Sequence, residues 1–148
     1  MSSNPEYSDG DFLISADKSK LNLKVIHGFL SRSYWAEGIT RDLVQKSMDH
    51  SFCFGVYHKN EQIGFARIIS DFTTFAYLAD VFILEDFRGK GLSKQLMDFI
   101  LSHPDLQRLR KWLLATRDAH GLYEKYGFRE LKNPGYMMEL HNPDYLKK

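Results

Sequence analysis

Four consecutive residues between an apolar run and a helix-like pattern, Arg88-Gly89-Lys90-Gly91, have the types and spacing that suit anion binding. A helix that begins near Lys90 leaves several backbone N–H groups unpaired and presents the positive end of its dipole. Two glycines let a ligand approach that backbone without meeting a Cβ, and Lys94 adds further positive charge. The combination suits a pyrophosphate. The simplest alternative is a strand-to-helix turn in which the glycines only allow a tight bend.

Two well-known phosphate-binding motifs do not match this stretch. The P-loop motif GxxxxGK[ST] has a longer spacing between its glycines. The dinucleotide motif GxGxxG requires a third glycine where this chain has Lys94, and it belongs early in a strand–helix–strand unit.

Other reactive residue types give weaker indications. Asp80 lies in the apolar run YLADVFIL, where an unpaired carboxylate is costly, so it has either a role in a site or an ion pair, for example with Arg67. Cys53 lies in another apolar run, which favours a buried, inert thiol. The histidines have no metal-ligand spacing, and we predict no metal. His120 is either an exposed helix histidine or a contact to a ligand.

Composition narrows the class of protein. The 148 residues are 43% hydrophobic and 26% charged, which is typical of one globular domain. With 20 basic and 19 acidic residues and no basic run, a nucleic-acid-binding surface is not expected. The N-terminus lacks the pattern of a signal peptide, and no apolar run is long enough to cross a bilayer. We therefore expect a cytoplasmic protein that does not associate with membranes.

The first half of the chain predicts two helices followed by strands. Residues 1–11 are polar and are expected to form a loose leader. Ser15 or Asp17 is a candidate cap for a first helix, and Thr40 for a second. Aromatic and β-branched residues then predict strands, and the segments are SFCFGVYH, IGFARIIS and TFAYLADVFIL.

The second half predicts a helix, a strand and smaller elements. An apolar stripe from Leu92 to Leu101 indicates a helix that ends at His103-Pro104. KWLLAT reads as a strand inside a sheet, AHGLYEKYGF as a short helix, and FREL with YMMEL as a closing hairpin. The prediction is a single α+β domain over residues 1–148, with helices flanking a mixed sheet.

The stretch EDFRGKGLSKQLM resembles the Arg/Gln-x-x-Gly-x-Gly/Ala signature of the GNAT acetyltransferase superfamily, with Ser93 at the final small position. AHGLYEKYGF is similar to the second signature of that family, with Tyr123 followed by Gly127-Phe128. The predicted order of elements agrees over about residues 13–140. The resemblance implies a GNAT-like fold: a central, mostly antiparallel sheet with one splayed pair of parallel strands.

The same resemblance implies that acetyl-CoA is the co-substrate and binds where the two parallel strands splay apart. Its pyrophosphate would rest on backbone N–H groups of residues 89–93, and its pantetheine arm would pair with the preceding strand. An N–H of that strand would stabilise the oxyanion. The implied cofactor-binding residues are Phe82, Ile83, Leu84, Arg88, Gly89, Lys90, Gly91, Leu92 and Ser93.

For catalysis, the resemblance implies that Tyr123 protonates the leaving thiolate. Asp80 would act as a base through water or hold the ammonium group of the acceptor, and Glu37 and Asp71 are weaker candidates. Many relatives carry asparagine where this chain has Thr116, which puts one cofactor contact in doubt.

The loop SRSYWAEGIT is expected to wall the acceptor site. Tyr34 and Trp35 would form an aromatic wall and Glu37 would attract an amine, although Trp35 equally suits an anchor for the loop. A small-molecule amine is the expected acceptor. Family members are often dimers, so a homodimer is one expectation for the assembly.

Three classes of function follow from the sequence. The leading hypothesis is an acetyl-CoA-dependent N-acetyltransferase. The second is a non-catalytic acyl-CoA-binding or regulatory domain, which a screen showing binding without turnover would support. The third is a phosphate- or nucleotide-binding protein, which comparable binding of ATP or NAD would favour.

Overall fold

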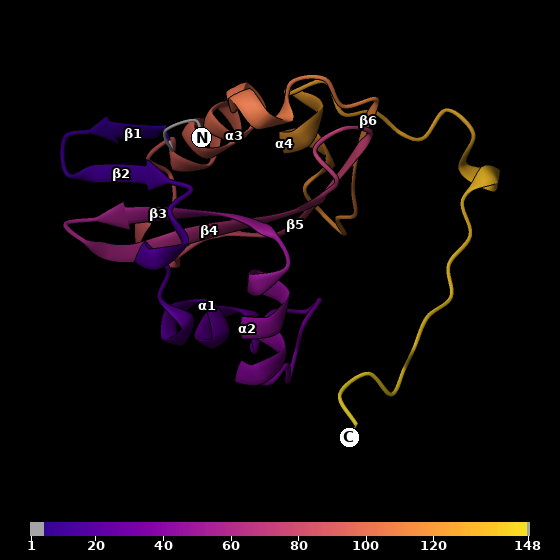
Figure 1. Cartoon of the computed structure of the whole chain (residues 1–148), viewed down its shortest axis with the longest axis horizontal. Coiled ribbons are helices and arrows are strands. Elements are labelled where there is room, and N and C mark those ends of the chain that lie inside the picture. The colour runs from indigo at the N-terminus through magenta and orange to yellow at the C-terminus, as the bar shows by residue number, and fades with distance from the viewer. Residues whose placement is uncertain (1–4, 148) are drawn as a thin grey trace. The chain divides into compact units, whose positions relative to one another are not determined.

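A computed structural model describes residues 5–147 of the chain, which form two compact units (Figure 1). The first unit is Met1–Leu114 and the second is Ala115–Lys148. Each unit is described by itself.

The first unit contains a six-stranded sheet in which the strands lie in chain order. All neighbours are antiparallel except the last pair, which is parallel. The mixed sheet predicted from the sequence is thus confirmed. Its strands are β1 (Glu6–Asp9), β2 (Phe12–Ser15), β3 (Phe52–His58), β4 (Glu61–Ser70), β5 (Phe75–Ile83) and β6 (Lys111–Leu114).

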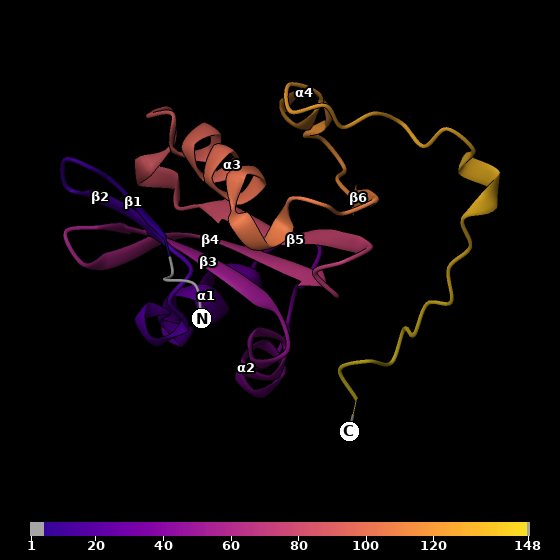
Figure 2. The same cartoon turned by 45° about the horizontal axis from the view of Figure 1, so that its top comes forward.

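Helices cover both faces of this sheet, with α1 and α2 on one side and α3 on the other (Figures 1 and 2). These helices are α1 (Leu23–Leu30), α2 (Arg41–Asp49) and α3 (Leu92–Ser102). Thr40 caps α2 as predicted, because its hydroxyl accepts from the Leu43 N–H at 3.3 Å. Short 3-10 helices cover Lys18–Lys20, Glu85–Phe87, Pro104–Leu106 and Pro134–Tyr136.

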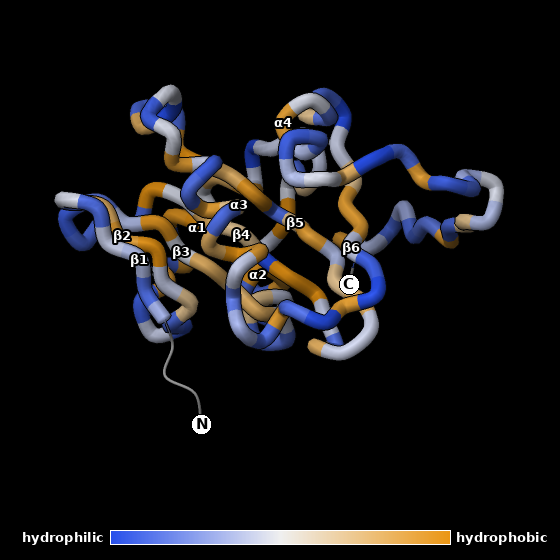
Figure 3. Tube along the Cα trace, turned by 90° about the horizontal axis from the view of Figure 1, so that it is seen from above, coloured by the Kyte–Doolittle hydropathy of each residue, from blue (hydrophilic) through white to orange (hydrophobic). Residues whose placement is uncertain are grey.

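The hydrophobic core lies between the sheet and the helices. Figure 3 shows apolar residues along β3, β4 and β5. In α1, Ile26, Phe29 and Leu30 are buried against the sheet. The ring of Phe29 stacks on that of Phe82, with centroids 4.1 Å apart. This contact joins α1 to the end of β5.

Three local predictions are wrong. The loose leader is wrong for Glu6–Asp9, which pair with β2 as β1; residues 1–4 lie outside the described residues. Asp17 caps the first 3-10 helix, whereas Asn22 caps α1. The KWLLAT strand lies at the end of the sheet order and not inside it.

The second unit contains α4 (His120–Glu124), as predicted, followed by an extended segment. The predicted closing hairpin is wrong, since the described residues 128–140 contain a 3-10 helix and no strand. The side chains of Tyr136, Met138 and Leu140 are exposed, so they do not form the packed face that a hairpin needs. Among the described residues, no helix is both long and apolar enough to cross a membrane.

His103 at the end of α3 predicts a pH dependence of stability. The ring is buried beside Phe52, Phe54 and Phe99, and burial lowers its pKa. A lowered pKa in the folded state contributes stability that is complete above the unfolded pKa of about 6.5 and is lost as pH falls through the folded-state value. We expect the free energy of unfolding, measured with urea, to fall between pH 7.5 and 5 by at most about 1.4 kcal/mol per pH unit from this group.

The matched variant is His103→Asn, whose side-chain oxygen can replace Nδ1 as acceptor of the Asp105 N–H. Its unfolding free energy should depend less on pH than that of the wild type over the same range. Parallel pH profiles for the two proteins would contradict this assignment.

Candidate active site

β5 carries a bulge at Asp80. Phe65 of β4 pairs with Phe82 and Arg67 pairs with Ala79, so β5 has one extra residue between these pairs. Asp80 has a φ of +55°, a left-handed conformation that aspartate tolerates better than most residues. Such a bulge bends the strand and redirects a side chain.

β5 also continues beyond its parallel neighbour. The pairing with β6 runs from Phe75 with Lys111 to Leu78 with Leu114, whereas β5 extends to Ile83. In the part of the chain that the structure describes, no strand pairs with this last stretch of β5 on the β6 side. A free backbone edge therefore follows the bulge.

The free edge presents Ile83 rather than its neighbours. Leu84 donates its N–H to the Ile63 carbonyl at 2.8 Å, and its own carbonyl accepts from the Phe87 N–H. Because backbone groups of successive strand residues face opposite edges, the N–H and C=O of Ile83 face away from β4. The Ile83 carbonyl accepts from Arg88 Nε at 3.0 Å. The resemblance implied that three residues of this strand, Phe82, Ile83 and Leu84, contact the cofactor. Of these, Ile83 is therefore the best placed to meet a ligand.

The glycine-containing junction has the open backbone that the sequence predicts. Gly89 and Gly91 both have a φ of +78°, and a Cβ at either position would meet nothing within 4 Å. α3 begins at Leu92, and no side chain caps its N-terminus through Gly91. The first backbone N–H groups of α3 have no carbonyl partner within the helix, and the side chain of Leu92 is buried in the core.

Basic side chains surround this junction. Arg88, Lys90 and Lys94 are exposed. Lys94 pairs with Asp98 at 3.0 Å, so its charge is partly neutralised within α3. Arg88 and Lys90 are the cations nearest in the chain to the two glycines.

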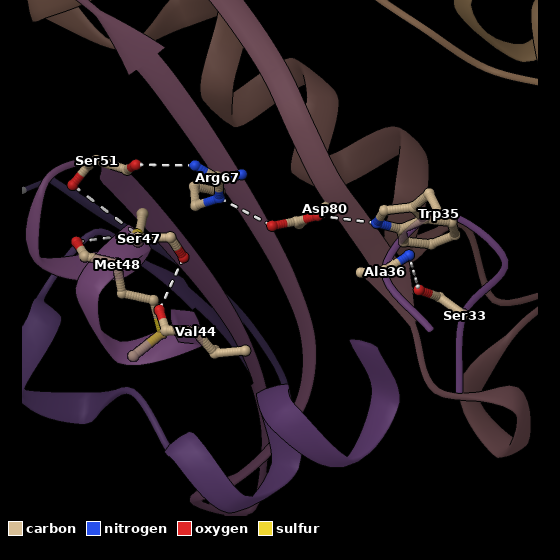
Figure 4. Close-up of polar contacts among 10 residues, drawn as sticks. Ser33, Trp35, Ala36, Val44, Ser47, Met48, Ser51, Arg67 and Asp80 are labelled. Atoms are coloured by element: carbon tan, nitrogen blue, oxygen red, sulfur yellow. Dashed lines mark hydrogen bonds and ion pairs between the residues drawn. The ribbon is translucent and has the colours of Figure 1, made fainter. Parts of the chain in front are cut away.

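A chain of hydrogen bonds joins the bulge to the loop between α1 and α2 (Figure 4). Asp80 Oδ2 accepts from Arg67 Nε at 2.8 Å, and Oδ1 accepts from Trp35 Nε1 at 2.8 Å. Arg67 also donates to Ser51 Oγ at 3.2 Å. The predicted ion pair of Asp80 with Arg67 is present, and two residues predicted for different roles, Asp80 and Trp35, are in direct contact.

The loop itself is held by its own contacts. Ser33 Oγ donates to the Leu30 carbonyl and accepts from the Ala36 N–H. The rings of Tyr34 and Trp35 meet edge to face with centroids 5.1 Å apart, and both remain substantially exposed. Trp35 therefore anchors the loop and still presents a surface. Glu37 lies in the same loop and is exposed.

The surroundings of two other reactive side chains, Asp71 and Cys53, indicate structural roles. The carboxylate of Asp71 accepts from the N–H groups of Thr73, Thr74 and Phe75, and these bonds, Thr74 first, hold its pKa far below the ordinary value. This weaker candidate base is a turn-forming group. Burial raises the pKa of the Cys53 thiol to about 11, which agrees with the predicted inert cysteine.

Tyr123 lies in α4 of the second unit, where its ring meets that of Phe128 edge to face at 6.0 Å. Thr116 Oγ1 accepts from the Ala119 N–H just before α4, so this side chain stabilises the local turn. His120 is exposed at the start of α4. The catalytic role of Tyr123 stays a prediction.

Among the described residues, no group of three potential metal ligands is present.

Two features of the site escaped the sequence analysis. Ser51, the far end of the hydrogen-bond chain, carries no sequence signal. Arg67 was named only as a partner of Asp80, although a charged residue inside the apolar run IGFARIIS marks it as a residue with a special environment.

Comparison with known proteins identifies the class to which this fold and site belong. The acetyltransferase (GNAT) domain family matches residues 49–130. A candidate acetyltransferase of Gibberella zeae is 30% identical over 142 residues, covering 80% of this chain and 79% of the relative. The chain belongs to the GNAT acetyltransferase family.

Solved structures agree with this assignment. A candidate GNAT-family acetyltransferase of Xanthomonas campestris is 48% identical, covers 93% of this chain and 97% of its own, and superposes with a TM-score of 0.89. A candidate acetyltransferase of Clostridium acetobutylicum, solved with acetyl-CoA, is 17% identical, covers 88% of this chain and 94% of its own, and has a TM-score of 0.62. The second likeness shows a shared fold only.

Proposed function

We propose that this chain is an N-acetyltransferase that moves the acetyl group of acetyl-CoA directly to an amine, with a small molecule as the acceptor. The observation that carries the proposal is the free edge of β5 beside Ile83, which is followed by two open glycines and then by a helix start that no side chain caps. An extended arm with a pyrophosphate at one end matches these two features in order. The relative from Clostridium acetobutylicum that was solved with acetyl-CoA supports this choice of ligand.

In the proposed complex, the pyrophosphate accepts from the backbone N–H groups of residues 89–93. Arg88 is exposed and has a flexible side chain, so it can leave or share the Ile83 carbonyl and contact a phosphate. The pantetheine arm pairs with Ile83, and the Ile83 N–H donates to the thioester oxygen. This donor stabilises the oxyanion that forms during transfer.

The reaction needs an uncharged amine, because an alkylammonium with a pKa of about 10.4 has no free electron pair. Loss of that proton to water or to a base frees the nitrogen to attack the thioester carbon. The nitrogen of the tetrahedral intermediate then loses one further proton to water or to the base, the carbon–sulfur bond breaks, and the departing CoA thiolate takes a proton. In the proposal Tyr123 supplies this proton.

The assay follows thiol release from acetyl-CoA with a panel of primary amines. For the amine that is used, Tyr123→Phe should lower kcat by about 100-fold, because general acid catalysis is worth roughly that much, and should leave acetyl-CoA affinity within about twofold. Leu122→Ala, a neighbouring change in α4, serves as the control for helix damage. An unchanged kcat in Tyr123→Phe would remove the acid role, and tight acetyl-CoA binding without turnover on any amine would make the chain a non-catalytic binding domain.

A further inference from the structure

The first unit contains a cavity of about 420 Å³ that is separate from the proposed CoA site. It is lined by residues of the turn that precedes β5 and of the segment that follows α3, whereas the free edge ends β5 and the glycine junction precedes α3. Since β5 has nine residues, its two ends are roughly 26 Å apart at about 3.3 Å per residue. The volume is within the range of about 300–1,000 Å³ that is usual for small-molecule sites. The lining residues are Phe72, Pro104, Asp105, Gln107 and Arg108.

Phe72 places an aromatic ring at this cavity from an unfavourable backbone conformation. Its φ is +62°, in the left-handed region that bulky side chains rarely adopt. The turn holds this conformation, because Ser70 Oγ accepts from the Phe72 N–H at 2.8 Å and the Asp71 carboxylate accepts from three following N–H groups. The ring packs against that of Phe52 with centroids 5.3 Å apart, and the residue is still 47% exposed. A fixed aromatic surface is therefore open to a ligand.

The polar groups of the cavity have unused capacity for hydrogen bonds and ion pairs. Gln107 Nε2 donates to the carbonyls of Leu101 and His103 at 2.9 and 2.7 Å, which fixes the amide and leaves Oε1 as an acceptor. Over the described residues 5–147, neither the Asp105 carboxylate nor the Arg108 guanidinium forms an ion pair. An anion, a cation and a neutral acceptor thus line one cavity beside an aromatic ring.

This set of groups matches the three parts of an aromatic α-amino acid. An ammonium group needs acceptors, and Asp105 and Gln107 Oε1 supply a charged and a neutral one. A carboxylate is well matched by a guanidinium, which Arg108 supplies. The rings of Phe72 and Pro104 offer apolar contact for an aromatic side chain. A ligand with only one charge would leave either Asp105 or Arg108 without a partner.

We propose that this cavity binds a free α-amino acid with an aromatic side chain. The carboxylate of the ligand binds Arg108, and its ring packs on Phe72. The ammonium group binds the Asp105 carboxylate and Gln107 Oε1. Because the cavity lies at the far ends of β5 and α3 from the glycine junction, the inference does not depend on the proposed acetyl transfer.

The probe is L-phenylalanine, titrated into ¹⁵N-labelled protein without acetyl-CoA and followed by the backbone amide resonances in NMR spectra. Amides within residues 71–75 and 103–108 should shift in a saturable manner with a Kd below about 1 mM, and those of residues 80–93 should stay in place. Phenethylamine lacks the carboxylate, 3-phenylpropionate lacks the ammonium group and L-alanine lacks the ring. Each of these should bind about tenfold more weakly than L-phenylalanine, because each loses one of the three contacts.

Variants at the cavity separate recognition from damage to the fold. Arg108→Met should weaken the binding of L-phenylalanine about tenfold but should not weaken that of phenethylamine, which has no carboxylate. Asp105→Asn should weaken L-phenylalanine to a similar degree but should not weaken 3-phenylpropionate, which has no ammonium group. Phe72→Asn introduces a residue that tolerates the left-handed conformation and removes the ring, so it should weaken all three aromatic ligands. Arg41→Met, at another exposed arginine of the first unit, should behave as wild type.

Saturable shifts at the cavity, together with the crossed responses of Arg108→Met and Asp105→Asn, would support the inference whether or not the protein transfers acetyl groups. Three results would overturn it: no saturable shift with L-phenylalanine, shifts confined to residues 80–93, or equal affinity for L-phenylalanine and the analogues that lack one of its parts.

Discussion

Gly91→Ala should weaken the binding of CoA to this protein by tenfold or more while the fold is retained. Gly91 precedes the first residue of α3 and has a φ of +78°, where an L-residue is strained by about 1–2 kcal/mol. The added methyl group has space in the ligand-free chain, so the loss arises from backbone strain and from contact with the bound pyrophosphate. Isothermal titration of CoA into each protein measures the effect.

Gly28→Ala is the matched control. Gly28 lies within α1, has an ordinary φ, and an added Cβ there would also meet nothing within 4 Å. The same chemical change should therefore leave CoA affinity unchanged and raise the free energy of unfolding by about 0.5–1 kcal/mol. Equal CoA affinity in Gly91→Ala and the wild type would show that the junction does not hold the phosphates.

Phe82→Ala should cost about 3–5 kcal/mol of the free energy of unfolding, as is usual for a buried phenylalanine. The Phe82 ring is 4% exposed and stacks on Phe29 with an angle of 9° between the planes. The contact holds α1 against the end of β5 that carries the free edge. Urea unfolding followed by circular dichroism measures the loss.

Ile69→Ala in β4 is the comparison for this variant. Ile69 is 43% exposed, so its truncation removes far less buried surface and should cost less than about 1 kcal/mol. Similar losses for the two variants would mean that the stacked pair is not a main contributor to the core.

The elements that the sequence predicts well are those with strong local signals. Thr40 marks the start of α2, and an apolar stripe with His103-Pro104 at its end marks α3. β3 and β4 follow from runs of aromatic and β-branched residues. In each case the local preference and the burial in the sheet agree.

An edge strand, the helix caps and the segment after α4 were harder to predict. β1 has the sequence EYSD, whose four residues are all exposed, and it is a strand because β2 offers a backbone edge for pairing. Ser15, Asp17 and Asn22 are all good helix caps, and the sequence alone does not rank them. The closing hairpin failed because alternating apolar residues in YMMEL indicate a strand only where a partner strand is present.

In the candidate site, too, some features can be predicted from the sequence and others cannot. The open backbone at Gly89 and Gly91 follows from residue type, and the sequence predicts it. The bulge at Asp80 depends on the register between β4 and β5, which no local pattern encodes. The contact between Trp35 and Asp80 joins residues 45 positions apart and emerges only from the packing of the loop on the sheet.

Calorimetric titration with acetyl-CoA, CoA, ATP and NAD tests the central claim most directly, which is that the Gly89–Gly91 junction and the free edge of β5 together hold a CoA thioester. The account predicts micromolar Kd values for acetyl-CoA and CoA and binding of ATP and NAD that is at least tenfold weaker, because only the CoA species carry the arm that pairs with Ile83. Absence of CoA binding, or equal binding of ATP or NAD, would contradict it.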